Sequence, residues 1–313
     1  MTIFVTGGLG FIGSNFVFAH LKRHAADDVI IIDNYSYAAN TKNVYGLYED
    51  YRVTIVNADI TDLNRLNYLY KTYNPTITYN FAAESHVDNS IRGDDAFVNT
   101  NIVGTHNILK CIKNFGGRLI HISTDEVFGS LGAFDPPFTE NTPYDPRNPY
   151  SATKAASDHL VRSYVNTHKI EAVVTNCSNN YGPRQHPEKF IPTIIRKAKA
   201  NEQIPVYGSG LNCRDWLYVD DHCAALLDIA DNFKSGERYN IGGGFEETNL
   251  NIARLILTMM DKPHSLINFV EDRKGHDFRY SMDSSKIRDE LKWIPKVDFY
   301  DGIRKTLEWY NNA

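Results

Sequence analysis

The chain has 313 residues, and its 33 basic and 38 acidic side chains give a formal net charge of −5. This small acidic excess argues against a protein that coats nucleic acid, because such proteins normally carry a basic excess or a basic patch. Hydrophobic residues make up 42% and charged residues 23% of the chain, as in globular proteins, so a wholly disordered chain is excluded. The length exceeds the roughly 250 to 300 residues at which single cores stop growing, so we expect one large domain with a smaller companion.

Membrane, redox and metal signals are weak. No apolar run approaches the ~18 residues that a membrane span needs, and the N-terminus opens into a strand pattern instead of a signal peptide, so we expect a cytoplasmic protein with no membrane partner. The four cysteines form no CxxC pair and are expected to be reduced. His20 and His24 have helical spacing but no acidic third ligand, so we expect a surface pair and no metal site.

The first half of the chain alternates short β-branched runs with longer amphipathic stretches. Because the two alternate strictly, the crossovers should be right-handed and the sheet parallel, with helices on both faces. The prediction is an α/β fold with a Rossmann-type doubly wound parallel sheet. Strands are predicted at residues 3–6, 29–33, 53–57, 76–81, 119–124 and 172–176, and helices at 11–23, 63–73, 96–113 and 150–168.

The alternation of strand and helix patterns ends after residue 176. Residues 178–192 are rich in Asn, Pro, Gly and charged side chains, which predicts a loop and places a domain boundary near residue 180. Residues 1–180 form the predicted Rossmann domain, which a segment near 215–242 rejoins, and residues 181–313 form a smaller C-terminal domain that we expect to bind substrate. Helices in this half are predicted at 191–200, 222–231, 249–260 and 301–310.

A glycine-rich loop follows the first predicted strand and leads into a helix. Here Gly7 allows a tight turn, Gly10 lets a pyrophosphate approach the backbone, and Gly13 permits close packing of helix on strand. The helix N-terminus adds unpaired N–H groups that bind phosphates. A glycine pattern alone is weak evidence, but its place between a strand and a helix at the start of a βαβ unit indicates a dinucleotide site.

Two acidic residues at strand ends refine the cofactor prediction. Asp33 ends the second predicted strand, 20 residues after Gly13, where a carboxylate can accept hydrogen bonds from the adenosine ribose. Its charge would repel a 2′-phosphate and no arginine follows closely, so NAD is favoured over NADP. Asp59, after the third strand, is a second candidate, although an Asp in this position commonly caps a helix or turn.

A Tyr and a Lys four residues apart give a second signal. On a helix this spacing puts Tyr150 and Lys154 on one face, so the ammonium can lower the pKa of the phenol and hold a nicotinamide ribose. Such a pair alone arises often by chance. Because it follows a dinucleotide loop and Thr124 at a strand end, the sequence resembles the extended branch of the short-chain dehydrogenase superfamily over essentially its full length.

Two adjacent carboxylates, Asp125 and Glu126, directly follow the strand predicted at 119–124. Parallel sheets place ligands outside the carboxyl ends of their strands, so both should face the nicotinamide and the substrate, although a solvated turn is the alternative. Two carboxylates in one pocket can have their pKa values pushed apart, one acting as acid and the other as base. An epimerase needs no such pair but a dehydratase does. The Thr-Asp-Glu triplet resembles that of the nucleoside-diphosphate-glucose 4,6-dehydratases of rhamnose and deoxysugar synthesis.

Further stretches extend this resemblance to most of the chain, namely 81–88, 179–183, 187–192, 214–219, 272–277 and 279–280. The catalytic residues it implies are Thr124, Asp125, Glu126, Tyr150 and Lys154. The NAD-binding residues it implies are Gly7, Gly10, Phe11, Ile12, Gly13, Asp33, Asn34, Tyr35, Ser36, Asp59, Ile60, Phe81, Ala82, Ala83, Ser85, Thr100, Tyr150, Lys154 and Asn180. The substrate-binding residues it implies are Ser85, His86, Thr124, Asn179, Lys189, Phe190, Pro205, Tyr207, Arg214, Asn249, Asp272, Arg273 and His276.

The resemblance implies a reaction in three stages on one glucose ring. Tyr150 would take the 4-hydroxyl proton while Thr124 binds the same oxygen. Glu126 would then remove the C5 proton while Asp125 protonates the departing 6-hydroxyl. NAD would be regenerated in each cycle and so stay tightly bound. The expected substrate is dTDP-glucose; UDP-glucose remains the alternative, and a 4-epimerase or a non-catalytic NAD-binding regulator is less favoured because all five catalytic groups are present.

Some residues qualify the expected substrate contacts. Arg214 and Arg273 lie in the predicted substrate half, where guanidinium groups suit a diphosphate, although a surface ion pair is the alternative for each. Tyr207 could stack on a nucleobase. The sequence departs from the family's usual residues at Cys213 and Lys274, which lie in the expected nucleotide contacts and leave the catalytic groups intact.

The helices predicted at 96–113 and 150–168 carry apolar or small residues on more than one face. One face must pack on the sheet, and the other could pair with a second subunit in a four-helix interface. We therefore expect a homodimer, with burial against the chain's own second domain as the alternative. The other expected partner is a small sugar nucleotide, and no nucleic acid.

Overall fold

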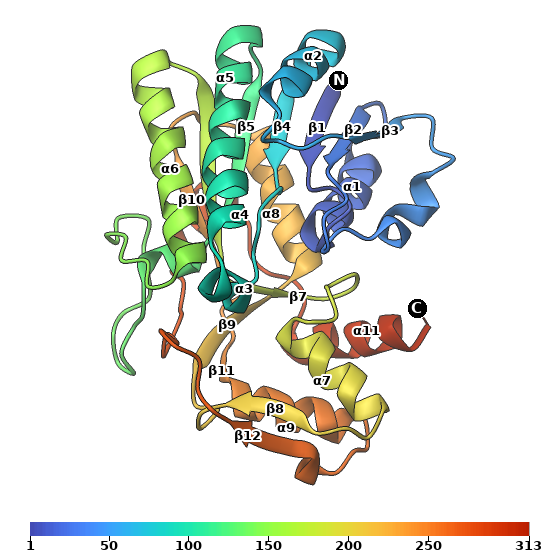
Figure 1. The fold of residues 1–313 in the computed structure, drawn as a ribbon, viewed down its shortest axis with the longest axis vertical. Helices are drawn as coiled ribbons and strands as arrows, with labels where there is room; N and C mark the ends of the chain where they lie inside the picture. Colours follow the sequence, from blue (N-terminus) through green and yellow to red (C-terminus); the bar gives the residue numbers. More distant parts are fainter. Residues whose placement is uncertain (313) are drawn as a thin grey trace.

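The computed structural model describes residues 1–312, and its centre is a seven-stranded parallel sheet (Figure 1). The strand order is β10-β6-β5-β4-β1-β2-β3, and all neighbouring strands run parallel. The predicted Rossmann-type sheet is thus confirmed. The chain order reverses between β1 and β4, which opens a crevice at their carboxyl ends. The strands span Thr2–Thr6 (β1), Asp28–Asp33 (β2), Val53–Asn57 (β3), Ile77–Asn80 (β4), Arg118–Thr124 (β5), Glu171–Cys177 (β6) and Arg238–Ile241 (β10).

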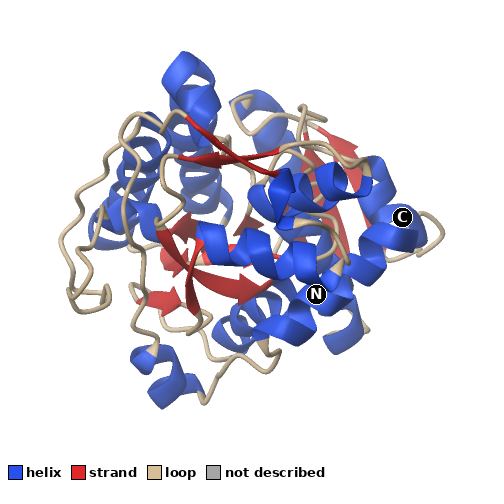
Figure 2. Cartoon of the chain, turned by 90° about the horizontal axis from the view of Figure 1, so that it is seen from below, coloured by secondary structure: helices blue, strands red, loops and turns tan. Residues whose placement is uncertain are grey.

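Helices cover both faces of the sheet (Figure 2), because successive residues of a strand point to opposite sides. In β1, Ile3 and Val5 pack in the core cluster that includes α1 (Phe11–Arg23) and α8 (Val219–Asp231), whereas Phe4 packs in the opposite cluster. All three side chains are fully buried, and each such burial contributes about 1.5 to 3 kcal/mol. The opposite helical layer consists of α2 (Leu63–Tyr73), α5 (Thr105–Phe115) and α6 (Pro149–His168).

The helix predicted at 96–113 is interrupted in the structure. The chain forms α4 (Asp95–Phe97) and then a π-helical segment, Val98–Gly104, before α5 begins. In this wide turn the Asn101 side chain accepts a hydrogen bond from the Glu84 N–H and donates to the Glu84 carbonyl, each at 3.0 Å. Its Nδ2 also donates to Thr153 Oγ1 of α6 at 2.9 Å. The prediction of one regular helix was wrong because these tertiary contacts, which the sequence period does not show, favour the π-turn.

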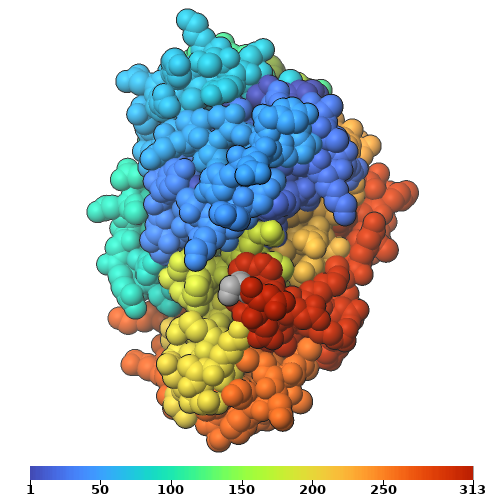
Figure 3. Space-filling view, turned by 90° about the vertical axis from the view of Figure 1, so that its right-hand side faces the viewer, coloured from blue at the N-terminus to red at the C-terminus, as the bar shows by residue number. Residues whose placement is uncertain are grey.

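The residues beyond β6 build a smaller part below the carboxyl edge of the main sheet (Figure 1). Its strands are β7 (Asn179–Tyr181), β9 (Cys213–Tyr218) and β11 (Glu246–Thr248) in one sheet, and β8 (Ile204–Tyr207) and β12 (Ile267–Val270) in another. They share a separate core with α7 (Phe190–Lys199), α9 (Asn249–Met259) and α11 (Phe299–Asn312). Figure 3 shows α11 beside the segment that contains α7.

The chain returns to the large sheet through α8 and β10, which lie between elements of the smaller part in sequence. The boundary near residue 180 and the two-domain division stay predictions, and residue 313 of the second domain lies outside the described residues. Most predicted elements differ from the structure by only one to three residues at an end. The prediction missed every strand after residue 177, namely β7, β8, β9, β10, β11 and β12. It also missed the 3-10 helices Thr41–Leu47, Asp125–Phe128 and His264–Leu266, and the helices α3 (Val87–Arg92) and α10 (Ser285–Leu291).

Several smaller predictions can be compared with the described residues. His20 is buried, with Nε2 3.1 Å from Asp27 Oδ2, so the expected surface pair with His24 is wrong for His20. The four cysteines are free. Within residues 1–312, no helix is long and apolar enough to cross a membrane, and no three or more His, Cys, Asp or Glu side chains are grouped to hold a metal ion.

Candidate active site

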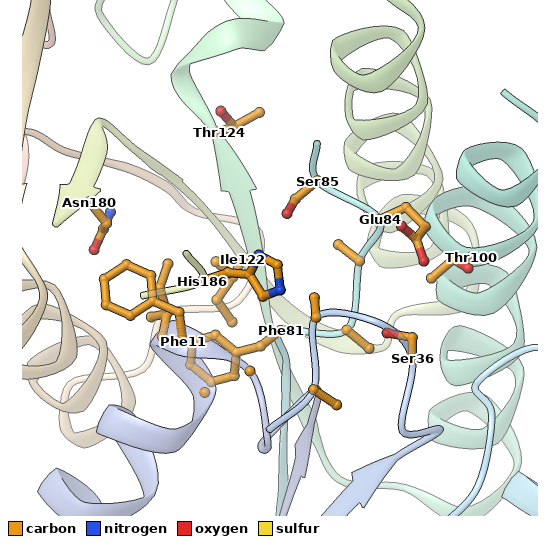
Figure 4. A pocket seen from close by; sticks show the side chains of 18 of the residues that line it. Phe11, Ser36, Phe81, Glu84, Ser85, Thr100, Ile122, Thr124, Asn180 and His186 are labelled. Atoms are coloured by element: carbon orange, nitrogen blue, oxygen red, sulfur yellow. The ribbon is translucent and has the colours of Figure 1, made fainter. Parts of the chain in front are cut away.

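A cavity of about 300 Å³ lies at the carboxyl ends of β1, β2, β4 and β5, where the strand order reverses. Figure 4 shows Thr124 at the end of β5, with Ser85 and Asn180 reaching the cavity from other segments. The cavity brings together most of the predicted site residues. Those that line it are Gly7, Gly10, Phe11, Ile12, Gly13, Asp33, Asn34, Ser36, Asp59, Ile60, Phe81, Ala82, Ala83, Ser85, Thr100, Thr124, Asp125, Glu126, Tyr150, Lys154, Asn179, Asn180 and Lys189.

The glycine loop is packed too tightly for side chains. Gly7 has a φ of +67°, and a Cβ there would lie 2.8 Å from the Ala82 nitrogen. A Cβ on Gly13 would lie 2.4 Å from the Gly7 carbonyl oxygen. No side chain of residues 1–312 caps the N-terminus of α1 at Gly10, so its first N–H groups can bind an anion in the cavity. The loop therefore has the form that a pyrophosphate requires.

The Asp33 carboxylate anchors this loop as well as facing the cavity. Its Oδ2 accepts a hydrogen bond from the Leu9 N–H and its Oδ1 one from the Tyr35 N–H, each at 3.0 Å. Burial raises the pKa of Asp33, and these two hydrogen bonds oppose that rise. Tyr35, a predicted cofactor residue, does not line the cavity. Asp59 does, and its Oδ2 accepts a hydrogen bond from Asn34 Nδ2 at 2.8 Å.

The two carboxylates after β5 are adjacent, and Asp125 is buried whereas Glu126 is half-buried. Burial, with the charges of Glu126 and Asp215, raises the pKa of Asp125 well above its ordinary value, against the opposing charge of Arg214. Asp125 Oδ1 accepts a hydrogen bond from Thr124 Oγ1 at 3.2 Å, and Oδ2 has no partner within residues 1–312. This setting favours the protonated form of Asp125, which has an oxygen free to donate. The alternative of a solvated turn is excluded by its 2% exposure.

Glu126 lies in a different electrostatic setting. Burial raises its pKa, whereas a hydrogen bond from Asn148 and the charges of Arg214 and Lys189 lower it. Asn148 Nδ2 donates to Glu126 Oε2 at 3.2 Å, and Asn148 is also the N-cap of α6 through Ser151. The start of the helix that carries the Tyr and Lys pair is thus tied to this carboxylate. Cations and a donor around Glu126 favour its ionised form more than that of Asp125.

The pKa of Tyr150 and the contacts of Lys154 differ from what their spacing predicts. Lys154 is buried, and its Nζ donates to the Ile122 carbonyl at 2.8 Å. Burial and the charge of Glu126 raise the pKa of Tyr150 well above its ordinary value. The predicted lowering of the Tyr150 pKa by Lys154 is therefore wrong for the described chain, because burial dominates and a backbone carbonyl holds the ammonium.

Several predicted substrate residues do not line this cavity. Arg214 donates from Nη2 to the Asp277 carbonyl at 3.0 Å and from Nη1 to the Cys213 carbonyl at 2.7 Å, and it stacks on the Tyr280 ring at 4.3 Å. These contacts hold the Arg214 guanidinium in the smaller part of the molecule, outside the lining of the cavity. The other predicted substrate residues outside the cavity lining are His86, Phe190, Pro205, Tyr207, Asn249, Asp272, Arg273 and His276.

Arg273 connects the smaller part of the molecule to α3. Its Nε lies 2.6 Å from Asp88 Oδ1, and Nη2 donates to Asp88 Oδ2 at 3.1 Å. The Tyr207 hydroxyl donates to the same carboxylate at 3.4 Å, and the guanidinium lies 5.1 Å from the Tyr207 ring centre. His276 Nδ1 is 2.7 Å from Asp272 Oδ1. Two of these predicted substrate residues, Arg273 and Tyr207, thus contact a carboxylate that the predicted site residues did not include, and the Asp272 and His276 pair adjoins them through the Arg273 N–H and the Tyr207 ring.

Sequence reasoning missed other residues at the site. Glu84, His186 and Glu188 line the cavity, and Asp215 adds its charge to Asp125. Burial raises the pKa of Asp215 to about 6. Asp215 lies inside a stretch that carried the family resemblance, so its position was visible in the sequence, but its proximity to Asp125 depends on how β9 packs. Asn148 could have been found from its place before a helix that begins with proline.

Comparisons with known proteins agree with this geometry. A family model described as GDP-mannose 4,6 dehydratase matches residues 4–306. The chain belongs to this dehydratase family. It is 44% identical over 329 residues to a Neisseria gonorrhoeae protein named dTDP-glucose 4,6-dehydratase, covering 98% of this chain and 95% of that one. A Mycobacterium tuberculosis protein of the same name is 44% identical over 314 residues, covering 100% and 94%.

The solved structures with a similar fold include a dehydratase and an epimerase. The dTDP-glucose 4,6-dehydratase of Streptomyces venezuelae, with NAD and TYD bound, matches with a TM-score of 0.96 and 42% identity, covering 100% of this chain and 98% of that one. The UDP-glucose 4-epimerase of Thermus thermophilus, complexed with NAD, matches with a TM-score of 0.91 and 26% identity, covering 100% of both. The fold therefore carries both reactions, and the acid and base groups must discriminate between them.

Proposed function

We propose that this protein removes water from dTDP-glucose to give dTDP-4-keto-6-deoxyglucose, with NAD as its cofactor. The observation that carries the proposal is the pair of the buried Asp125 and the half-buried Glu126 beside Tyr150 and a dinucleotide cradle. Relatives 44% identical over nearly the whole chain bear the name of this activity. A 4-epimerase needs no acid and base pair, so the pair favours dehydration over the reaction of the similarly folded epimerase.

The proposed acid and base follow from the two carboxyl environments. Asp125, protonated because burial and Glu126 raise its pKa, donates a proton to the departing 6-hydroxyl. Glu126, which Asn148 and two cations help to ionise, removes the proton from C5. The sugar must therefore bind with C5 and C6 between these two side chains. One group gives a proton as the other takes one, so this step exchanges their protonation states and leaves the charge of the pair unchanged. Glu126 is reset when it returns its proton to C5, and Asp125 is reset by a proton from solvent that balances the one Tyr150 takes from the 4-hydroxyl and releases.

Tyr150 and Thr124 act at the 4-hydroxyl in this proposal. Tyr150 accepts its proton, and a hydrogen bond from Thr124 favours the phenolate against the raising effect of burial. Lys154 holds the strand below the site through the Ile122 carbonyl and is placed to contact a nicotinamide ribose. Bound NAD would supply the hydride acceptor for C4 and the hydride donor for C6.

The residues of the cavity fit NAD. The close glycine backbone and the uncapped N-terminus of α1 suit a pyrophosphate, and Asp33 would receive the adenosine ribose and repel a 2′-phosphate. Because the reaction returns the hydride, NAD would stay bound between turnovers. We further propose that residues 1–180, together with 215–242, hold NAD, and that the remainder holds the sugar nucleotide.

The sugar nucleotide would extend from the cavity toward the Arg214 and Arg273 side. Lys189 is the bridging cation in this proposal, since it lines the cavity and its Nζ donates to the Ser85 carbonyl at 2.8 Å. Arg214 and Arg273 would bind the diphosphate, and Tyr207 would contact the base. Thymidine is proposed as the nucleoside because the similar S. venezuelae structure was solved with TYD and the 44% identical relatives are named for dTDP-glucose.

One assay tests the function. Purified protein is incubated separately with dTDP-glucose and UDP-glucose, and the 4-keto product is read by its absorbance in alkali. We expect product from dTDP-glucose at the higher rate, and NAD in the supernatant after the protein is denatured without any added cofactor. Absence of keto product from both sugars contradicts the dehydratase assignment, and a higher rate with UDP-glucose contradicts the nucleoside.

We also propose that the protein is a cytoplasmic homodimer joined through α5, α6 and the π-helical segment. Val98 and Val103 of that segment are 41% and 40% exposed beside α6, as an apolar interface requires. Val103→Glu should shift the sedimentation coefficient from dimer to monomer. The control Tyr68→Glu, at a 59% exposed position on α2, should leave it unchanged. A monomeric unmodified protein contradicts the dimer, and cell fractionation tests the compartment.

A further inference from the structure

The face of α6 that carries Tyr150 and Lys154 continues to a third ionisable residue. Asp158 follows Lys154 by four residues, so helical geometry places the three side chains in one row. Asp158 is 0% exposed, and none of the proposed chemical steps uses it. A fully buried carboxylate is costly unless hydrogen bonds and charges compensate for its lost hydration, so its surroundings indicate what it stabilises.

Three side chains from three segments donate to one Asp158 oxygen. Oδ2 accepts hydrogen bonds from Tyr144 Oη at 2.7 Å, Ser123 Oγ at 2.9 Å and Asn176 Nδ2 at 3.4 Å. The His121 ring nitrogen Nε2 lies 3.4 Å from Oδ1. Burial raises the pKa of Asp158, but the neighbouring His121, the charge of Lys154 and the hydrogen bond from Tyr144 bring it below its ordinary value. Asp158 is therefore a buried anion.

The donors connect Asp158 to the catalytic end of β5. Ser123 immediately precedes Thr124, the residue at the end of β5 in Figure 4. Asn176 Nδ2 also donates to the Thr124 carbonyl at 2.9 Å. Asp158 thus holds both the residue before Thr124 and the side chain that fixes the Thr124 carbonyl. A shift of this carboxylate would move the strand end from which the acid and base pair begins.

The same network reaches the strand that precedes the glycine loop. His121 Nδ1 lies 3.2 Å from Asn80 Nδ2, and Asn80 Oδ1 accepts a hydrogen bond from Thr6 Oγ1 at 2.6 Å. Thr6 is the last residue of β1, directly before Gly7. Buried polar side chains therefore join β1, β4, β5 and β6 beneath the cavity, with Asp158 at one end. The hydrogen bonds of this network hold together the elements that they join.

Asp158 also compensates the charge of Lys154. Burial lowers the pKa of Lys154, and the charge of Asp158 is the main effect that opposes this shift. The titratable groups around the ammonium are Tyr150 and Asp158 on α6, His121 on β5 and Cys177 on β6. Burial raises the pKa of the Cys177 thiol to about 12, so it stays neutral, and Asp158 is the group of this set that carries a negative charge at neutral pH.

We propose that Asp158 is a positioning residue of the dehydratase site: it fixes the Ser123 and Thr124 end of β5 against α6 and supplies the buried negative charge that balances the Lys154 ammonium. The proposal rests on the proposed function, because it assigns Asp158 a part in that reaction. It predicts effects on the chemical step and on its pH dependence, and little effect on substrate affinity, since Asp158 lies behind the strand and does not line the cavity.

The substitution Asp158→Asn keeps the shape of the side chain and removes its negative charge. We expect kcat for dTDP-glucose to fall by about 10²-fold, the loss expected when reacting groups shift by about an ångström. KM should change by less than about threefold, because ground-state binding is untouched. Loss of the anion lowers the pKa of Lys154, so its ammonium is lost at lower pH and the alkaline limb of the kcat profile moves to lower pH. Asp158→Glu should restore the limb's position. An unchanged kcat and pH profile in Asp158→Asn overturns the proposal.

A matched pair of milder variants keeps the test valid if Asp158→Asn does not fold. Tyr144→Phe removes a 2.7 Å hydrogen bond to Asp158, and Tyr70→Phe removes a buried 2.7 Å hydrogen bond to Thr78 away from the site. We expect kcat to fall in the first and to stay unchanged in the second. Equal kcat values for the two variants overturn the proposal. An unmodified protein without keto product contradicts the proposed function, whereas an active one with unaffected variants contradicts the role of Asp158 alone.

Discussion

Replacing Glu126 by Gln separates the first chemical stage from the second. The amide has the size of the carboxylate and its oxygen can still accept the hydrogen bond that Asn148 Nδ2 donates at 3.2 Å. The backbone hydrogen bond from the Glu126 N–H to Thr124 Oγ1, at 3.3 Å, is also unaffected. The start of α6 and the end of β5 should therefore keep their positions. What is lost is the lone pair that removes the C5 proton.

The expected size of the effect follows from that loss. A positioned general base contributes about 10² to 10⁴-fold to a rate. At about 1.4 kcal/mol for each factor of ten, this is about 3 to 5 kcal/mol on the barrier to water elimination. The stability change should be smaller, about 1 kcal/mol or less, because the neutral hydrogen bond from Asn148 persists. Oxidation at C4 uses Tyr150 and should continue.

Two absorbance readings test this separation. With dTDP-glucose, Glu126→Gln should accumulate enzyme-bound NADH while forming keto-deoxy product at least about 10²-fold more slowly than the unmodified enzyme. The control Glu237→Gln removes a carboxylate that pairs with Lys286 at half-exposed positions, next to β10 and outside the cavity lining, and should leave both readings unchanged. Full turnover by Glu126→Gln would refute the assignment of the base.

Three further predictions concern other buried groups. Asp125 must be protonated to act, so activity should fall as pH rises through its raised pKa. Asp215→Asn removes a charge that raises the pKa of Asp125, so the alkaline limb of the kcat profile should move to lower pH. An unchanged limb would contradict this prediction. Gly13→Ala places a Cβ 2.4 Å from the Gly7 carbonyl, so the purified variant should contain little NAD, and normal NAD content would contradict the cradle. Burial lowers the pKa of His222 from 6.5 to about 3, so the unfolded chain binds a proton that the folded one does not, and stability falls as pH drops below 6.5. His222→Gln should reduce this slope by up to about 1.4 kcal/mol per pH unit in urea unfolding, and an unchanged slope would contradict it.

The sequence determined the fold class and most of the cavity lining. Buried parallel strands read as short apolar runs, and the turn from β1 into α1 needs glycines at fixed spacing, so local chemistry makes both visible. The same applies to Thr124, Asp125 and Glu126, because Thr124 ends β5 and the two carboxylates follow it directly, so all three lie at the carboxyl edge of the sheet. Such features depend on residues close together in the chain.

The tertiary structure decided what depends on distant segments. The π-turn at Asn101 exists because Glu84 and Thr153 bind its side chain, and no sequence period records that contact. The raised pKa of Tyr150 and the hydrogen bond of Lys154 to Ile122 follow from burial under other elements, so the spacing of the pair did not reveal them. The burial of a side chain and the electrostatic field that acts on it depend on neighbours from the whole fold. The sequence alone therefore located the reacting groups, whereas their pKa values and their positions depend on the tertiary structure.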